Sequence, residues 1–373
     1  MERIMSRTLR AWVMLLALAV IAPATAPGCS TFALRKGDRL LFARNFDFFT
    51  GSGAIMVNPR GLSKTALVFP GEKAASWTAR YGSVTFNQVA REFPMGGMNE
   101  AGLVVEMMWH DAAAYPERDE RPGMMELQWM QFLLDTCATV GDAAAVAETV
   151  RVMPMGSRLH FHLLDRAGGE AVAEFIAGRS RFYTGGDLPV PALTNQTYER
   201  CLAALPGFRG FGGDKPLHAT LNDPDRFAAL AEAVRRPVKE KAMLERAWAI
   251  LEEVHSDGPE SPTQWRLVYD PRKLEIHLRT RRNPAPRRLR LADVSFACAD
   301  GARVLDLEKG VGDLGKLLSG YTPEFNAGLV KRTFAAYRQA GFQQGISDME
   351  LAFMAAYPNG LACADEPHGR GGK

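Results

Sequence analysis

The stretch Gly28-Cys29-Ser30-Thr31-Phe32 and the hairpin that it opens decide the fold expected for this chain. Two strand-like runs, residues 29–35 and 39–46, flank the turn Lys36-Gly37-Asp38. A two-residue turn with glycine at its first central position is of type II′ and closes a tight hairpin. The sequence therefore predicts an antiparallel pair of strands that begins at Cys29.

The register of this hairpin predicts where its reactive side chains lie. Each step away from the turn moves both strands equally, so facing residues sum to about 75 in residue number. Cys29 then falls opposite residues 45–47, with Arg44 and Asp47 on either side of that position. A thiol, a cation and a carboxylate are expected to meet there, provided that the register is not displaced by one residue.

The first 28 residues have the pattern of a secretory signal peptide. A basic segment precedes an apolar run, residues 11–22, that is too short to span a bilayer comfortably. Small residues in Ala26-Pro27-Gly28 favour cleavage directly before Cys29, with competing cut sites after Ala24 and Ala26. We expect a periplasmic or secreted protein without a membrane span, whose residues 29–373 form one domain with a disordered tail at 366–373.

Composition excludes several classes of protein. The 373 residues are 47% hydrophobic, which is enough for a large core, and their formal net charge is +3. Arg3, Arg7 and Arg10 against Glu2 give the leader a surplus of two, so the remainder carries about +1. No basic run is dense enough to indicate a nucleic-acid partner.

Five cysteines, an odd number, indicate one free thiol in an exported protein. Cys29 is the natural free one, which leaves Cys137, Cys201, Cys298 and Cys363 to form up to two disulfides in three connectivities. Cys137 lies on the apolar face of a helix-like segment, so a buried free thiol is an equal alternative for it.

Apolar periodicity divides the rest of the chain into strands and helices. Helical spacing covers residues 124–137, 142–152, 224–235, 239–253, 324–340 and 348–357. Strand patterns cover residues 54–57, 66–69, 81–86, 103–109, 159–164, 171–176, 181–183, 190–195, 265–269 and 274–279, and a loop is expected at 204–222. Two runs of strands separated by a helical pair predict an α+β protein built in layers.

A cysteine at the very N-terminus brings its own base. A free α-amino group titrates near ~8, so it can take the proton of the attacking thiol without any histidine. An adjacent arginine favours the thiolate, and a carboxylate such as Asp47 can hold the amino group in position. Acyl transfer also needs donors for the developing oxyanion, such as an asparagine amide and a backbone N–H.

Five short motifs follow one another along the chain at spacings that can be compared with those of known families. They are Cys29-Ser30-Thr31-Phe32, Ala43-Arg44-Asn45-Phe46-Asp47, Gly97-Met98-Asn99-Glu100-Ala101-Gly102-Leu103, Leu193-Thr194-Asn195 and Asp225-Arg226-Phe227. With these motifs the chain resembles the choloylglycine hydrolase family, which includes penicillin V acylases and bile salt hydrolases. The resemblance spans residues 29 to about 280. It implies a four-layer αββα sandwich of the N-terminal-nucleophile hydrolase type that needs no cofactor.

The resemblance also implies roles for individual residues. Cys29 matches the family's nucleophile, and Arg44 and Asp47 match the active-site arginine and aspartate that follow it. Asn195 matches the asparagine of the oxyanion hole. Arg226, in an Arg-Phe pair that opens a helix, is similar to the second active-site arginine.

Aromatic residues are expected around the substrate. Trp109 falls where bile salt hydrolases carry an asparagine and penicillin V acylases a tyrosine, a position that gives its backbone N–H to the oxyanion hole. Together with Phe48 and Phe49 it offers a surface for an aromatic or extended acyl group. His160 and His162 share one strand face without a third ligand at useful spacing, so we interpret them as structural and expect no metal site.

The sequence thus predicts an exported hydrolase of linear, non-peptide amide bonds that acts on a small N-acyl amide through an acyl-thioester on Cys29. A preference like that of penicillin V acylases is favoured, N-acyl-homoserine lactones or other N-acyl amines are the alternative, and bile salts fit less well. A homo-oligomer, either dimer or tetramer, is a further expectation. The rival from another class is a non-catalytic lipoprotein anchored through Cys29, for which Ala26-Pro27-Gly28 is a poor lipobox.

Overall fold

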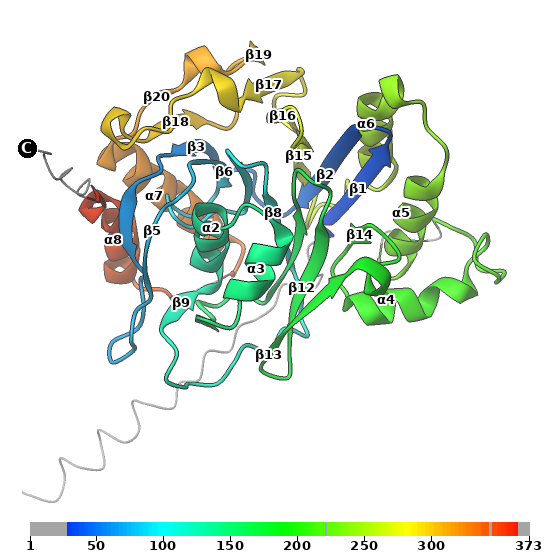
Figure 1. The fold of residues 1–373 in the computed structure, drawn as a ribbon, viewed down its shortest axis with the longest axis horizontal. Helices are drawn as coiled ribbons and strands as arrows, with labels where there is room; N and C mark the ends of the chain where they lie inside the picture. Colours follow the sequence, from blue (N-terminus) through cyan, green and yellow to red (C-terminus); the bar gives the residue numbers. More distant parts are fainter. Residues whose placement is uncertain (1–27, 219, 221, 343–344, 365–373) are drawn as a thin grey trace, which may run out of the picture.

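Two large sheets lie at the centre of the computed structural model, which describes residues 28–218, 220, 222–342 and 345–364 (Figure 1). The expected signal peptide, apart from Gly28, and the expected disordered tail lie outside the described residues. The first sheet has the order β14 (Ala192–Leu193), β1 (Ser30–Lys36), β2 (Arg39–Asp47), β15 (Thr263–Asp270), β16 (Glu275–Thr280), β17 (Arg287–Arg290) and β19 (Gly312–Asp313).

The second sheet is larger and holds strands from both halves of the chain. Its order is β13 (Arg179–Thr184), β12 (Glu170–Ile176), β11 (Leu159–Leu164), β8 (Val104–Trp109), β7 (Gly96–Asn99), β6 (Ser83–Asn87), β3 (Ala54–Asn58), β18 (Arg303–Asp306) and β20 (Ser319–Gly320). Two small sheets pair β10 (Arg151–Met153) with β9 (Gly123–Met125), and β21 (Ala362–Cys363) and β5 (Ser76–Thr78) with β4 (Leu62–Thr65).

Helices cover the outer face of each sheet. On the first sheet, α5 (Asp225–Arg235) and α6 (Met243–Glu253) pack against β1, β2 and β14. On the second, α2 (Glu126–Thr136) packs against β7 and β8, and Leu329 of α7 (Pro323–Gln339) packs on Ala54, Met56 and Val304. The shorter helices are α3 (Val140–Val146), α4 (Tyr198–Ala204) and α8 (Asp348–Ala356). The molecule is therefore the predicted α+β, four-layer αββα sandwich.

The first hairpin has the predicted register. Ser30 pairs with Asn45, Thr31 with Arg44 and Lys36 with Arg39, so every facing pair sums to 75. Gly37 has φ +54°, a left-handed conformation that glycine adopts without the clash of a Cβ atom. The turn chemistry of one glycine thus fixes which side chains meet at the far end of the hairpin.

Several predicted elements differ from those observed. Residues 66–69 form no strand, because the chain turns back at Pro70-Gly71 and the ladder of β4 ends at Thr65. The helix expected from residue 124 begins at Glu126, since Met124 and Met125 pair with β10. The helix expected to reach residue 152 ends at Val146, because Arg151–Met153 form β10 and pair with β9. Helix α4 and the strands after residue 283 were not predicted.

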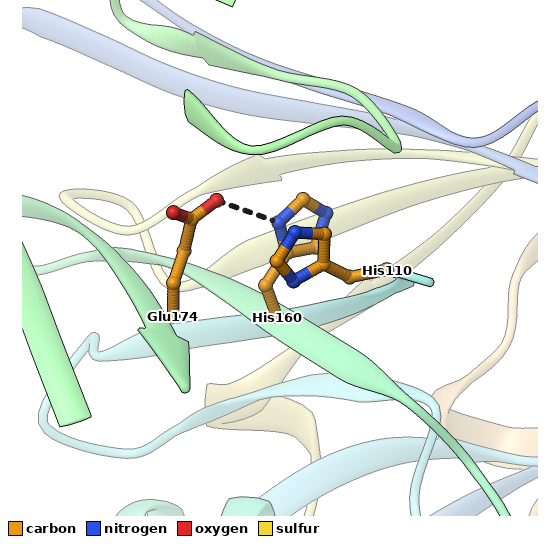
Figure 2. Close-up of side chains that lie close together, drawn as sticks. All are labelled: His110, His160 and Glu174. Carbon is orange, nitrogen blue, oxygen red and sulfur yellow. Dashed lines mark hydrogen bonds and ion pairs between the residues drawn. The ribbon is translucent and has the colours of Figure 1, made fainter. Parts of the chain in front are cut away.

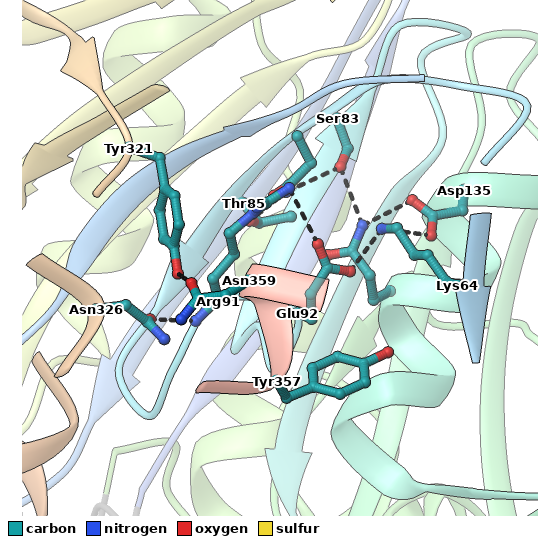
Figure 3. Close-up of polar contacts among 12 residues, drawn as sticks. Lys64, Ser83, Thr85, Arg91, Glu92, Asp135, Tyr321, Asn326, Tyr357 and Asn359 are labelled. Atoms are coloured by element: carbon teal, nitrogen blue, oxygen red, sulfur yellow. Dashed lines mark hydrogen bonds and ion pairs between the residues drawn. The ribbon is translucent and has the colours of Figure 1, made fainter. Parts of the chain in front are cut away.

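A buried lysine joins three separate parts of the chain (Figure 3). Lys64 on β4 places its Nζ 2.5 Å from Glu92 Oε2 and 2.9 Å from Asp135 Oδ2. Asp135 belongs to α2, and Glu92 lies in the loop between β6 and β7 with φ +75°. Because both carboxylates contact the same buried cation, the loop at residues 88–95 is tied to the sheet and helix behind it.

Candidate active site

Cys29 lies directly before β1 and is 3% exposed. Its thiol donates to the main-chain carbonyl of Asp47 over 3.7 Å, which is the meeting that the hairpin register predicted. Burial raises the pKa of the Cys29 thiol; the positive charge of Arg44 opposes this effect without reversing it. The thiol is therefore largely protonated at neutral pH and needs a base to become a nucleophile.

Asp47 ends β2 with its carboxylate buried beside the start of the hairpin. One oxygen, Oδ1, accepts a hydrogen bond of 2.5 Å from the Thr263 hydroxyl on β15. The other oxygen, Oδ2, has no hydrogen-bond partner among the described residues. A Cβ atom built on Gly28 would lie 3.3 Å from this oxygen, so the chain just before Cys29 passes next to it. Burial raises the pKa of Asp47 to about 7.

Arg44 is fully buried and has an acidic partner that sequence reasoning missed. Its Nη1 donates to the carboxylate of Glu106 on β8 and to the main-chain carbonyl of Met95. The Tyr269 hydroxyl donates to the other oxygen of Glu106 over 2.5 Å. Arg44 therefore acts on Cys29 only through its field, while its hydrogen bonds tie the two sheets together. A single acidic residue inside the apolar run Val104-Val105-Glu106-Met107-Met108 was the signal available in the sequence.

Glycine makes room for this ion pair. A Cβ atom at Gly96 would lie 2.0 Å from Glu106 Oε2, a separation that no side chain tolerates. The first glycine of Gly96-Gly97 therefore allows the carboxylate to lie flat against β7 and reach Arg44.

Asn195 and Arg226 meet near the start of the hairpin, from parts of the chain 31 residues apart. Arg226 Nη2 donates to Asn195 Oδ1 over 2.8 Å, and a Cβ atom on Gly28 would lie 2.7 Å from Arg226 Nη1. Asp223, a second residue that sequence reasoning missed, holds both: its carboxylate accepts from the Asn195 main-chain N–H at 2.6 Å and lies 3.1 Å from Arg226 Nη2. The structure thus gathers Arg226 and Asn195 next to the start of the hairpin.

The main chain of Trp109 faces Asn195. Asn195 Nδ2 donates to the Trp109 carbonyl over 2.8 Å. On the β11 side, His110 N–H donates to Arg158, so Trp109, opposite Leu159, is at a non-bonded position of that ladder. Both main-chain polar groups of Trp109 therefore point away from β11, toward the side where Asn195 lies and where β7 has already ended.

Cys29 lines a largely apolar pocket, part of which is open to solvent. Its lining is Cys29, Phe46, Phe48, Gln88, Val89, Met95, Met107, Trp109, Leu127, Met155, Ser157, Leu159, Tyr337 and Phe342. Phe48 and Trp109 line it as the sequence predicted. Phe49 does not: its ring packs against that of Phe48, with centroids 4.1 Å apart and planes tilted by 34°. Tyr337 and Phe342, which the sequence did not suggest, close the pocket from the C-terminal part of the chain.

Comparisons with known proteins fit this arrangement. A family model described as acyl-coenzyme A:6-aminopenicillanic acid acyl-transferase matches residues 34–199. Penicillin V acylase of Pectobacterium atrosepticum is 26% identical over 278 residues, which cover 64% of this chain and 73% of that protein. The structure of penicillin V acylase from Agrobacterium tumefaciens has a TM-score of 0.69 at 25% identity and covers 79% of this chain and 98% of its own. These comparisons confirm that this chain resembles the choloylglycine hydrolase family.

A second solved structure supports the αββα fold of this chain. Conjugated bile acid hydrolase from Clostridium perfringens has a TM-score of 0.61 at 16% identity and covers 76% of this chain and 98% of its own. The family model begins at residue 34, so Cys29 itself lies outside that match. In the described part of the chain no helix is both long and apolar enough to cross a membrane.

Proposed function

We propose that this chain, once residues 1–28 are removed, hydrolyses linear amides with Cys29 as its nucleophile. The observation that carries the proposal is the position of Cys29, which lines an apolar pocket while Asp47 and Arg226, the latter bonded to Asn195, lie beside the preceding residue, Gly28. Because burial holds the thiol in its protonated form, the mechanism needs a base, and a free α-amine on Cys29 supplies one.

Asp47 lies close enough to the start of the hairpin to hold that amine. Its Oδ2 atom lies beside the chain at Gly28, where a Cβ atom would be 3.3 Å away. An ammonium group formed at Cys29 would give this buried oxygen a donor and would favour its ionised form. Thr263 keeps the carboxylate in orientation through the other oxygen.

Asn195 and Trp109 are proposed to stabilise the oxyanion. The amide nitrogen of Asn195 carries two hydrogens, and the bond to the Trp109 carbonyl uses one of them. The Trp109 N–H points to the same side of β8 as its carbonyl. These two N–H groups are the donors that we propose for a tetrahedral intermediate on Cys29.

The reaction follows from these positions. Cys29 Sγ forms a bond to the amide carbon as its proton passes to the α-amine, and the oxyanion is held by Asn195 and Trp109. The α-ammonium returns the proton to the leaving nitrogen as the C–N bond breaks. Water then adds to the thioester with the α-amine as base, and the C–S bond breaks to release the acid and the thiol.

The pocket supports an aromatic or extended acyl group. Phe46, Phe48, Trp109 and Phe342 surround it with rings, and its methionines adapt to irregular shapes. We therefore favour phenoxyacetyl amides, as in penicillin V, over N-acyl-homoserine lactones and over conjugated bile acids.

Removal of the leader belongs to this proposal, as does export to the periplasm or beyond. A disulfide joins Cys298 and Cys363, while Cys29, Cys137 and Cys201 are free and buried. Disulfides persist in oxidising compartments, which supports export. The described chain thus has one of the two disulfides that the cysteine count allowed. Of the two alternatives for Cys137, a disulfide or a buried free thiol, the structure has the free thiol.

A comparison of two N-termini tests the function. Protein that starts at Cys29 should hydrolyse penicillin V, whereas protein that starts at Gly28 should be at least about 100-fold slower, because an amide nitrogen is no base at neutral pH. Cys29→Ser should lose most activity. Cys201→Ser is the matched control, since its thiol is buried, has a pKa raised to about 12 and does not line the pocket at Cys29.

Mass spectrometry separates the rival functions. The exported protein should begin at Cys29 without added mass, and a slow substrate should leave one acyl group on it. A diacylglycerol on Cys29 would instead establish the lipoprotein. Faster turnover of N-acyl-homoserine lactones or of conjugated bile acids than of penicillin V would overturn the proposed substrate preference while leaving the nucleophile in place.

A further inference from the structure

Three side chains that the proposed reaction does not use converge on the second sheet (Figure 2). His110 follows the last residue of β8, His160 lies on β11 and Glu174 on β12. Phe161 pairs with Ala173, so His160 and Glu174 face one another one step further along. One ligand atom from each of the three lies within 4.8 Å of the others, and all three residues are buried. His160 is one of the two histidines that the sequence presented as structural; its partners are not His162 but residues 50 and 14 positions away.

Several polar atoms of this cluster lack partners. Among the described residues, both ring nitrogens of His110, Nε2 of His160 and Oε2 of Glu174 make no hydrogen bond. Buried polar atoms are normally paired, and a group of unpaired ones indicates a bound water or ion. His162 provides the contrast, since its Nδ1 contacts the Thr31 hydroxyl at 2.8 Å and its Nε2 contacts Glu170 at 2.8 Å.

The charge of the cluster suits a divalent cation. The cluster consists of two imidazole rings and one carboxylate, all buried. Neutral imidazoles and carboxylates are the ligand forms that Zn²⁺ takes in proteins.

We propose that His110, His160 and Glu174 bind a divalent ion of the Zn²⁺ type. His160 Nδ1 and Glu174 Oε1 lie 3.1 Å apart. Two ligands at about 2.0–2.1 Å from Zn²⁺ are roughly 3.3 Å apart in a tetrahedral shell, so an ion in place of the shared proton needs little movement of either group. The carboxylate is held for this role by the Tyr198 main-chain N–H, which donates to Oε1 over 2.8 Å.

Binding requires one rearrangement, at His110. Its ring is stacked on His160 with centroids 4.4 Å apart and planes 11° apart, so the two lone-pair directions do not yet meet. The His110 main chain is held by its N–H bond to Arg158, but rotation of its ring breaks no side-chain hydrogen bond to the described residues. The two histidines and one carboxylate then leave a fourth position for water.

The position of the site gives the ion a structural role. His110 adjoins Trp109, and Tyr198 follows Asn195 by three residues at the start of α4. If the proposed function holds, an ion here braces the two residues that supply the oxyanion donors. Metal content tests the site without any assay of activity, so the two proposals can fail separately.

The test is the metal content of untagged protein. Wild-type protein is incubated with excess zinc sulfate and then gel-filtered. It should retain about one zinc per chain, as measured by inductively coupled plasma mass spectrometry. His110→Ala should retain less than about one tenth of that, and it should fold, because its ring makes no hydrogen bond to the described residues. Glu174→Gln should also lose the ion, whereas His162→Gln, the matched control, should keep it. Near-UV circular dichroism checks the fold of each variant.

Thermal unfolding gives a second reading. Zinc should raise the melting temperature of the wild type but not of His110→Ala, since only a ligand of the folded state stabilises it. Wild-type protein without retained zinc would show a pocket for water only and overturn the proposal. Retention by His110→Ala, or equal loss from His162→Gln, would place the ion elsewhere and also overturn it.

Discussion

Arg44 has both an electrostatic effect on Cys29 and a structural role between the two sheets, and the sequence indicated only the first. The hairpin register places it beside Cys29, where its charge favours the thiolate, but its hydrogen bonds go to Glu106 and Met95 on the facing side. The register could be predicted because it depends on a single local turn. Glu106, Asp223 and Thr263 could not, because they come from strands and loops whose position depends on the packing of whole sheets.

The Arg44–Glu106 pair predicts a large stability effect. Arg44→Ala leaves a buried carboxylate without its cation and should cost about 3–5 kcal/mol of unfolding free energy. In the double variant Arg44→Met/Glu106→Gln neither position carries a buried charge. Much of the lost unfolding free energy should therefore be regained, while activity stays low. Chemical denaturation measures both. A cost below about 1 kcal/mol for Arg44→Ala would contradict a buried, mutually dependent pair.

Asp47 predicts a dependence of stability on pH. Burial raises its pKa to about 7 in the folded chain, against about 4 for an unfolded aspartate. Because the folded state holds the proton more tightly, the associated stability is complete below pH ~4 and is lost as the pH rises through ~7. The melting temperature of protein that starts at Gly28 should therefore fall between pH 5 and 8.

Two variants separate this effect from those of other groups. Asp47→Asn should make the fall shallower, although Glu106, with its pKa raised by burial to about 6, keeps part of it. Asp38→Asn, at the exposed tip of the same hairpin, should leave the profile unchanged. An unaltered slope in Asp47→Asn would show that Asp47 is ionised in the folded chain throughout this range.

At the scale of elements, local periodicity predicted the longer helices better than the short strands. The helices α5, α6, α7 and α8 lie within a few residues of the predicted ranges because an amphipathic pattern over eleven residues or so is a strong local signal. Short strands such as β17, β18 and β20 carry no such signal, since what makes them strands is the neighbour that they pair with. The contribution of the C-terminal segment to the pocket depends on that same non-local packing.

The position of Phe342 leads to a prediction about the acyl selectivity of the proposed enzyme. It contacts Trp109, with ring centroids 5.8 Å apart, and Phe48 at 5.6 Å, and it lines the pocket. Phe342→Ala should enlarge the pocket and shift preference toward longer acyl chains, raising the KM for penicillin V several-fold with a smaller change in kcat. The control is Phe353→Ala, since Phe353 is 64% exposed on α8. Equal kinetics of Phe342→Ala and wild type across a series of acyl lengths would remove Phe342 from the acyl site.

At the scale of the whole molecule, the C-terminal part is built into the sandwich and is not an appendage. The main hydrophobic core runs from Cys29 to Met354. Strand β18 pairs with β3, and β21 pairs with β4. The Cys298–Cys363 disulfide then closes a loop of 65 residues around these pairings. A single domain over residues 29–373 stays a prediction.

Calorimetry tests whether that domain unfolds as one unit. We expect a single transition, because no set of strands can leave its sheet without exposing core shared with the rest. Loss of a disulfide that closes 65 residues should cost about 4 kcal/mol and lower the melting temperature by roughly 5 °C. The double variant Cys298→Ser/Cys363→Ser should show this shift, and a reductant should produce it in the wild type but not in that variant. Two separate transitions, with the C-terminal part unfolding first, would contradict a single domain and would make the pocket wall at Phe342 an independently folding unit.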